Sequence, residues 1–119
     1  MTIRECYKKL GGDYDEVFGR LQNEKLISRV LVKFISDKSC ETLISSIETA
    51  NFEEAFRAAH TLKGICMNLN LGKLYKSCAE LTELLRNFNS VKAEDTVKLV
   101  EQMKVDYEDT IAAINEFNS

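Results

Sequence analysis

Proline and tryptophan are absent from this chain of 119 residues, glycine occurs only five times, and histidine only once. Because proline and glycine interrupt helices most strongly, their scarcity favours long helical segments. No apolar run approaches the roughly 18 residues that a membrane span needs, and the N-terminus lacks the apolar stretch of a signal peptide. We therefore expect a helical, cytoplasmic protein with no membrane segment.

The charge and composition narrow the class of protein further. The formal net charge is −3, and the basic residues are scattered among acidic ones. Nucleic acid needs a clustered basic face, so we expect no nucleic-acid partner. Hydrophobic residues make up 45% of the chain and charged residues 29%, which is typical of a folded domain. This length predicts one domain covering residues 1–119, and we expect a standalone, monomeric protein.

The four cysteines, Cys6, Cys40, Cys66 and Cys78, show no CxxC spacing. Without a secretory context, disulfides are not expected. A zinc site would require the single histidine to join widely separated thiols, so we expect no metal on this chain. Cysteines at helical spacing are more simply small buried apolar residues.

Apolar residues recur at helical spacing along the whole chain. Thr2 can cap a helix over residues 3–10 that Gly11 ends, and a second short helix covers residues 13–18. Further helices are expected over residues 23–35, 39–50, 51–69, from Gly72 as N-cap to about residue 85, and after the loop of residues 87–90. Asn51 is expected to cap the helix of residues 51–69, and Asn70 to end it in the left-handed conformation. This pattern predicts an all-α fold. We expect an antiparallel up-down-up-down bundle of four helices of similar length, with a short additional N-terminal helix laid across one end.

The only histidine, His60, lies within the expected helix of residues 51–69. The apolar stripe of that helix consists of Phe52, Ala55, Ala59, Leu62, Cys66 and Leu69. His60 falls roughly 130° from the centre of this stripe, so it should face away from the core. Arg57, Gly64 and Asn68 lie on the same side, one or two turns away.

Gly64 and Lys63 give this exposed face its chemical interest. A glycine inside a helix costs about 1 kcal/mol relative to alanine. Gly64 is either a tolerated surface glycine or a position where a side chain would block whatever approaches the imidazole. Lys63 can bring its ammonium group toward phosphoryl oxygens in that space. The pattern therefore indicates a nucleophilic nitrogen with free space and a cation beside it.

The run Ala58-Ala59-His60-Thr61-Leu62-Lys63-Gly64 resembles the signature of histidine-containing phosphotransfer domains, which are four-helix-bundle modules of two-component phosphorelays. The resemblance continues more weakly from about Ile35 to Ile114. It implies that His60 is the phosphoacceptor, that Lys63 offsets charge on the phosphoryl oxygens, and that Gly64 provides clearance.

The same resemblance implies partners and supporting residues. The partners would be receiver domains of response regulators or hybrid histidine kinases, docking on apolar residues such as Ile65 and Met67. Some family members carry an amide that orients the imidazole at about the position of Thr82, where threonine is shorter. Asn68 or a bound water could serve instead, and Arg57 is a further supporting candidate. Any Mg²⁺ would belong to the receiver, so we expect no cofactor on this chain.

The residues favour a phosphoryl carrier over an enzyme. An imidazole has a pKa of about 6.5, so much of it is neutral and nucleophilic at cellular pH. The chain has no GxxxxGK[ST] loop for ATP and no recognisable nucleophile triad. Two alternatives remain open at this point. One is an adaptor bundle that binds a receiver without being phosphorylated, and the other is a thiol-based sensor or metal binder that depends on Cys66 and Cys78.

Overall fold

The computed structural model describes all 119 residues and contains helices only. The helices are α1 (Ile3–Leu10), α2 (Tyr14–Leu21), α3 (Glu24–Phe34), α4 (Ser39–Glu48), α5 (Phe52–Leu69), α6 (Gly72–Leu85) and α7 (Ala93–Asn118). None of them is both long and apolar enough to cross a bilayer. The expected all-α fold is confirmed.

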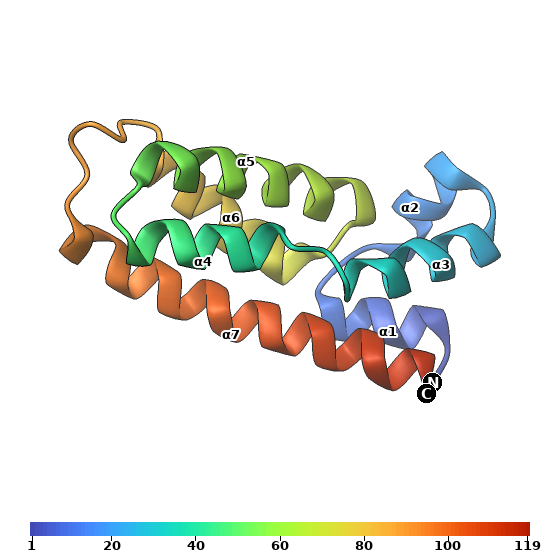
Figure 1. Ribbon diagram of the computed structural model, residues 1–119. Coiled ribbons are helices and arrows are strands. Elements are labelled where there is room, and N and C mark those ends of the chain that lie inside the picture. The colour runs from blue at the N-terminus through green and yellow to red at the C-terminus, as the bar shows by residue number, and fades with distance from the viewer.

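The bundle consists of α4, α5, α6 and α7. Each helix packs against the next one along the chain, and α4 also packs against α7. Figure 1 shows that the chain reverses direction between successive helices of this group. The expectation of similar lengths is wrong, because the four helices have 10, 18, 14 and 26 residues. The surplus length of α7 extends beyond α4, α5 and α6 and gives the N-terminal helices a surface to pack on.

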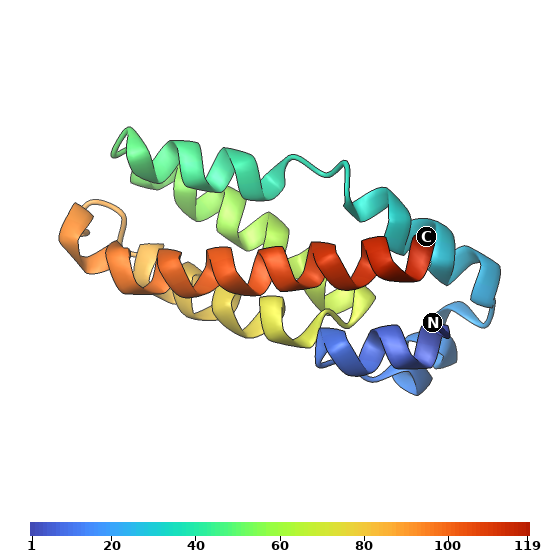
Figure 2. The same cartoon turned by 90° about the horizontal axis from the view of Figure 1, so that it is seen from below.

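Three helices precede the bundle, whereas the bundle prediction provided for one. The sequence predicts that α2 and α3 are helical, but it does not predict that they lie outside the four-helix bundle. Helix α1 lies beside the C-terminal half of α7 rather than across an end of the bundle (Figure 2). The Cys6 thiol donates to the carbonyl of Ala113 at 3.6 Å, and Lys9 forms an ion pair with Glu116 at 2.7 Å. The buried residues of α1, which are Ile3, Cys6, Tyr7 and Leu10, belong to the same core cluster as Ala113 and Ile114 of α7, so apolar burial decides the position of α1.

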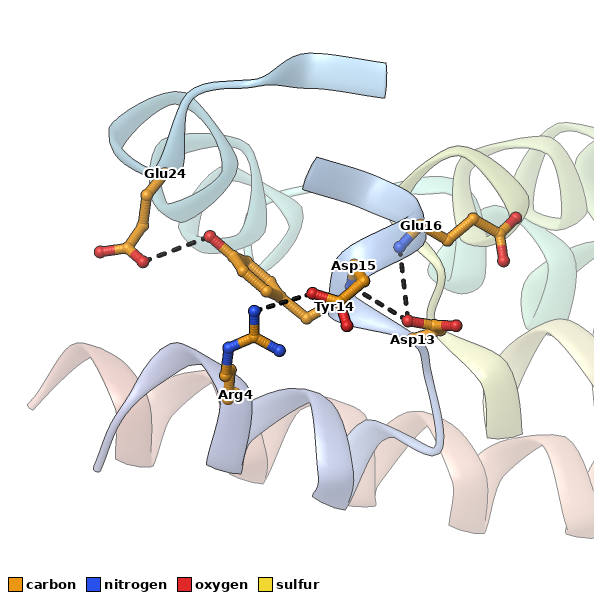
Figure 3. Close-up of polar contacts among 6 residues, drawn as sticks. All are labelled: Arg4, Asp13, Tyr14, Asp15, Glu16 and Glu24. Carbon is orange, nitrogen blue, oxygen red and sulfur yellow. Dashed lines mark hydrogen bonds and ion pairs between the residues drawn. The ribbon is translucent and has the colours of Figure 1, made fainter. Parts of the chain in front are cut away.

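A polar cluster ties α1, α2 and α3 together (Figure 3). The Arg4 guanidinium lies 5.0 Å from the centre of the Tyr14 ring and forms an ion pair with Asp15 at 2.7 Å. The Tyr14 hydroxyl donates to a Glu24 carboxylate oxygen at 3.2 Å. The hydrogen bond from Arg4 holds the pKa of Asp15 below its usual range. Because Arg4 and Asp15 are exposed, this ion pair adds little stability, and the buried Tyr14 ring contributes more.

Most of the expected helix ends are confirmed. Thr2 forms a capping box with Glu5, and Gly11 has the left-handed conformation with φ of 70°. Gly72 is not the N-cap of α6, because Leu71 occupies that position and Gly72 is the first helical residue. A Cβ atom on Gly72 would collide with the Gly11 carbonyl oxygen. Glycine at this position therefore allows α6 to meet the end of α1.

The core runs through the whole molecule as one cluster of 25 buried apolar residues. All four cysteines are buried, as the sequence predicts, and none forms a disulfide in the structure. The largest fully buried side chains are Tyr7, Leu10, Ile27, Leu31, Leu43, Leu62, Leu71, Leu74, Leu81, Leu85, Met103 and Ile114. These residues come from every helix except α2, so α2 depends on its neighbours for its position.

Candidate functional site

The candidate site lies on α5, whose start is fixed by its N-cap. The Asn51 side-chain oxygen accepts a hydrogen bond from the backbone N–H of Glu54 at 3.3 Å. Glu53 and Glu54 in the first turn also favour this end, because carboxylates interact well with the positive end of the helix dipole. The predicted cap at Asn51 is confirmed.

The C-terminal end of α5 is fixed more firmly, because all four of its last carbonyls have partners. Arg20 of α2 donates to the carbonyls of Met67 and Asn68, at 3.4 and 2.5 Å. The Tyr7 hydroxyl of α1 donates to the Leu69 carbonyl at 2.8 Å, and the Leu71 backbone N–H donates to that of Cys66. The N-terminal helices therefore satisfy groups that a helix end otherwise leaves to water.

The turn after α5 uses the left-handed conformation expected for it. Asn70 has φ of 56° and ψ of 46°, so it stops α5 where glycine often does. Its side-chain oxygen also accepts from the backbone N–H of Asp13 at 2.7 Å. Asn70 thus ends the helix and connects it to the segment before α2, which glycine could not do.

His60 lies near the middle of α5 with its side chain exposed. No hydrogen bond or ion pair within the chain involves its imidazole. Its ring centre lies 6.1 Å from that of Phe56, one turn earlier, and the planes are tilted by 52°. Both ring nitrogens are therefore open to a group that arrives from solvent.

Lys63 lies on the flank of α5 that faces α6. The hydrogen bond and the charge of Arg86 lower the pKa of the Glu83 carboxyl on α6, and the charge of Lys63 adds a smaller effect in the same direction. None of the five ion pairs in the structure includes Lys63. Its ammonium group is therefore beside the histidine face with no carboxylate within 4 Å.

Gly64 borders open space. A Cβ atom added there would meet nothing within 4 Å, whereas one on Gly72 would collide with backbone. Packing within the molecule therefore does not require glycine at position 64. A helix-interior glycine still costs about 1 kcal/mol relative to alanine. Glycine at position 64 is therefore either needed when another molecule or group occupies this space, or not needed at all.

The three supporting candidates lie in different places. Arg57 is on the flank toward α4 and forms an ion pair with Glu53 at 3.6 Å. Asn68 is exposed two turns after His60, and its side chain forms no hydrogen bond within the chain. Thr82 is completely buried, and its hydroxyl donates to the Cys78 carbonyl at 2.6 Å. The structure therefore does not bring the Thr82 hydroxyl to the imidazole.

The comparison with protein families explains this arrangement. The family model described as the Hpt domain matches residues 36–115, about two thirds of the chain. The chain belongs to the Hpt domain family. No curated protein and no solved structure is similar enough to count as a match.

Membership of the Hpt family sets the role of the bundle. Hpt domains are phosphocarriers that interact with receiver domains in two-component signalling, so this chain has a phosphotransfer-type role. The matched region begins at Ser36 and contains α4 to α6 and most of α7. Helices α1, α2 and α3 precede it, so the segment that satisfies the end of α5 is an addition to the Hpt region.

The structure also shows residues that the sequence did not indicate, namely Phe56 beside His60 and the two residues that cover the Phe56 ring. The Arg86 guanidinium lies 5.5 Å from the centre of the Phe56 ring. The centre of the Phe88 ring lies 6.3 Å from the centre of the Phe56 ring. Arg86 also forms an ion pair with Glu83 at 2.8 Å. Phe56 could have been found from its i−4 spacing to His60. Arg86 and Phe88 are distant in sequence, and only the packing of α5 on α6 brings them close.

The cysteines do not form a second reactive site. Burial raises the pKa of the Cys6 thiol to about 11 and that of Cys40 to about 12. The pKa of Cys66 is raised by its hydrogen bond with Cys78 and by burial. The reactive species is the thiolate, which these environments disfavour. No group of three or more His, Cys, Asp or Glu side chains is arranged to hold a metal ion.

Proposed function

We propose that this protein carries a phosphoryl group on Nε2 of His60 and exchanges it with aspartates of receiver domains. The observation that carries the proposal is the exposed imidazole, which has no partner within the chain and lies one turn from the open space at Gly64. An Hpt domain needs an accessible nucleophile, and this chain has one histidine.

The transfer follows from the chemistry of the imidazole. The Nε2 lone pair attacks the phosphorus of an aspartyl phosphate, a P–N bond forms, and the P–O bond to the aspartate breaks. The aspartate leaves as a carboxylate, and the reverse reaction returns the group to another receiver. Any Mg²⁺ that this exchange needs belongs to the receiver in our proposal, and the protein itself acts as a carrier without kinase activity, in the cytoplasm.

Lys63 and Gly64 assist in different ways. The Lys63 ammonium can swing toward the phosphoryl oxygens, where a charge-assisted hydrogen bond is worth about 1.5–3 kcal/mol. Gly64 leaves room for the group and for the receiver that delivers it. Loss of a hydrogen bond of that strength corresponds to a rate about tenfold lower or more. We therefore expect Lys63→Ala to slow transfer by on the order of tenfold or more. Lys98→Ala, which removes an exposed lysine of α7, is the matched control.

The test uses phosphoramidate, a small donor that needs no partner protein. Wild type and His60→Gln are incubated with it, and the intact mass of each is measured, with circular dichroism to show that both are folded. We expect wild type to gain one phosphoryl group that is labile in acid and stable in base. We expect the variant to gain none.

The opposite results are equally clear. A folded wild type that stays unmodified would contradict the carrier function and favour an adaptor that binds receivers without phosphorylation. A phosphorylated His60→Gln variant would place the modification on another residue.

A further inference from the structure

The imidazole of His60 has no hydrogen-bond partner that fixes its orientation. Its side chain is exposed, and no hydrogen bond or ion pair within the chain involves either ring nitrogen. The Thr82 hydroxyl donates to the Cys78 carbonyl instead. A nucleophile that turns freely reaches the geometry for attack only part of the time, so transfer benefits from a group that restricts the ring.

The aromatic ring beside the imidazole is that of Phe56, on the preceding turn of α5. The two ring centres are 6.1 Å apart, and the planes are tilted by 52°. Aromatic rings attract one another at centre-to-centre distances of about 4.5–7 Å. Helical side chains also lean toward the N-terminus, so the His60 side chain leans toward the turn that carries Phe56. The contact therefore restricts the rotation of the imidazole.

The C-terminal side of the imidazole is open. A side chain at position 64 would lean back over His60 for the same reason, but Gly64 has none. A Cβ atom added there would meet nothing within 4 Å. The imidazole thus has an aromatic ring on one side and free space on the other, which leaves a direction from which a phosphoryl group can approach.

The Phe56 ring is itself held by residues from outside α5. It is half-buried and packs against the core. The Arg86 guanidinium, just after α6, lies 5.5 Å from its centre, and the Phe88 ring centre lies 6.3 Å from it. Arg86 in turn donates to both carboxylate oxygens of Glu83, at 2.8 and 3.4 Å. The packing of α6 on α5 therefore sets the position of the Phe56 ring.

Phe52, one turn before Phe56, shows what burial alone requires on this helix. It too is half-buried and packs against the core. None of the five aromatic pairs and neither of the two cation–π contacts includes it. Leucine would satisfy apolar burial at either position, whereas only an aromatic residue makes the ring contacts of Phe56. The surroundings of Phe56 therefore indicate a role beyond burial.

We propose that Phe56 is a positioning residue for His60, which keeps the imidazole in orientations that present Nε2 to the open space at Gly64. Arg86 and Phe88 keep the Phe56 ring in place. This proposal rests on the proposed function of His60. It assigns the orientation of the nucleophile to an aromatic ring on the same helix, in place of the amide expected near position 82.

The experiment compares Phe56→Leu with Phe56→Tyr and with Phe52→Leu. Leucine keeps an apolar side chain but removes the ring, whereas tyrosine keeps the ring. Phe52→Leu is the matched control, because it makes the same change at a half-buried position one turn away. Urea denaturation measures the stability of each variant. The orientation of the imidazole is measured by nuclear magnetic resonance, from the couplings between the Hα and the two Hβ protons of His60.

Transfer is measured in two ways. Phosphoramidate is a small donor that can reach His60 from any open direction. A receiver domain approaches in one orientation, and the probe is the receiver of a purified panel that phosphorylated wild type labels fastest. The rate at saturating receiver is measured separately from the receiver concentration that gives half of that rate.

We expect wild type and Phe56→Tyr to show one large and one small coupling, as a single helical rotamer gives, and Phe56→Leu to show averaged couplings. At saturating receiver, Phe56→Leu should transfer about three- to tenfold more slowly, which is the size of an aromatic contact. Its half-saturating receiver concentration and its labelling by phosphoramidate should stay close to wild type. Phe52→Leu should lose a similar amount of stability and match wild type in orientation and transfer.

A second variant, Phe88→Ala, tests the support of the Phe56 ring without changing α5. Phe88 lies in the loop after α6 and is not among the residues that pack against the core, so the fold should be kept. Its couplings should be partly averaged and its transfer slower, by less than in Phe56→Leu. An unchanged imidazole in Phe88→Ala would overturn the support assigned to Phe88.

Three outcomes separate the two proposals. Wild-type couplings in Phe56→Leu would overturn the positioning role and leave the function of His60 intact. Equal losses of transfer in Phe56→Leu and Phe52→Leu would also overturn it, since the effect would then be one of stability. If Phe56→Leu averages the couplings but no donor phosphorylates wild type, Phe56 orients the imidazole and the carrier function fails.

Discussion

On the inner face of α5, Ala55, Ala59, Leu62 and Cys66 are completely buried, whereas on the outer face His60 is exposed and Gly64 borders open space. Every inner side chain packs against other helices of the bundle. The outer imidazole forms no hydrogen bond or ion pair within the chain. One helix thus combines a face that the fold requires with a face that the fold does not use.

The two faces of α5 are therefore expected to control different properties, the inner face stability and the outer face phosphoryl transfer. Residues of the inner face determine where α5 lies, and through it where His60 points. Residues of the outer face contribute little to stability, and Gly64 lowers it by about 1 kcal/mol relative to alanine. Substitutions on the inner face should therefore change the free energy of unfolding, and substitutions on the outer face should change phosphoryl transfer.

The largest effect on stability is expected from Leu62→Ala on the inner face. Leu62 is fully buried, so truncation leaves a cavity and should lower the free energy of unfolding by about 2–5 kcal/mol. Urea denaturation measures this change. Thr61→Ala, one residue away but exposed, is the control and should shift it by no more than about 0.5 kcal/mol. Similar losses in both variants would mean that the two faces are not distinct.

A smaller loss is expected at the end of α5. Tyr7→Phe removes the hydroxyl that donates to the Leu69 carbonyl, which should cost about 1–3 kcal/mol if that carbonyl finds no other donor. Urea denaturation again provides the measurement. Phosphoramidate labelling of His60 should be unchanged, because the imidazole lies more than two turns from that bond. A variant as stable as wild type would show that water replaces the hydroxyl.

Sequence patterns predicted the local features of the fold better than its assembly. The caps at Thr2, Asn51 and Asn70 depend on side chains near in sequence, and the structure contains all three. The position of α1 along α7 depends on the surplus length of α7, which local spacing does not reveal. The N-cap predicted at Gly72 is wrong for the same reason, because glycine is required there by the approach of the distant Gly11 backbone.

In the candidate site too, some features follow from local sequence and others only from the packing of distant segments. The direction in which His60 points follows from helical periodicity alone, since the apolar stripe places it outward. Ile65 was expected near the histidine with Met67, but it lines a groove with Val30 and Phe34 of α3, away from the exposed face. The contacts of Phe56 with Arg86, and the closing of α5 by Arg20, required the packed structure because they join distant segments.

Gly64→Ala is expected to change stability and transfer in opposite directions. The added methyl group meets nothing within 4 Å, so the free energy of unfolding should rise by about 0.5–1 kcal/mol. Transfer to a receiver should slow, and Gly64→Leu should slow it further, because each side chain enters the space beside the imidazole. Gly19→Ala is the control, since Gly19 is also helical with nothing within 4 Å. It should gain stability and leave transfer unchanged.

If Gly64→Leu transfers as fast as wild type, Gly64 is only a tolerated surface glycine. Stability should be followed by thermal denaturation and transfer by the loss of phosphoryl label to the receiver.

The smallest effect near neutral pH is expected from the buried thiols. Burial raises the pKa of Cys6 to about 11 and that of Cys40 to about 12, from about 9.0 for an exposed thiol. Above pH 9 the thiols of the unfolded chain lose protons that the folded protein keeps up to about pH 11 and 12. The contribution of these thiols to stability should therefore be constant below pH 9 and fall as the pH rises above it. Urea denaturation at several pH values measures this slope. Cys40→Ala should reduce it, and an unchanged slope in that variant would contradict the assignment.

The central claim, that the outer face of α5 carries the phosphoryl group on His60, is tested most directly by nuclear magnetic resonance. Because the chain has one histidine, labelling histidine with ¹⁵N marks a single imidazole. After treatment with phosphoramidate, we predict one ³¹P signal coupled to Nε2 of His60, with amide shifts concentrated on the exposed face around Lys63 and Gly64. A folded protein with no phosphorus–nitrogen coupling, or with a ³¹P signal from another residue, would contradict the account.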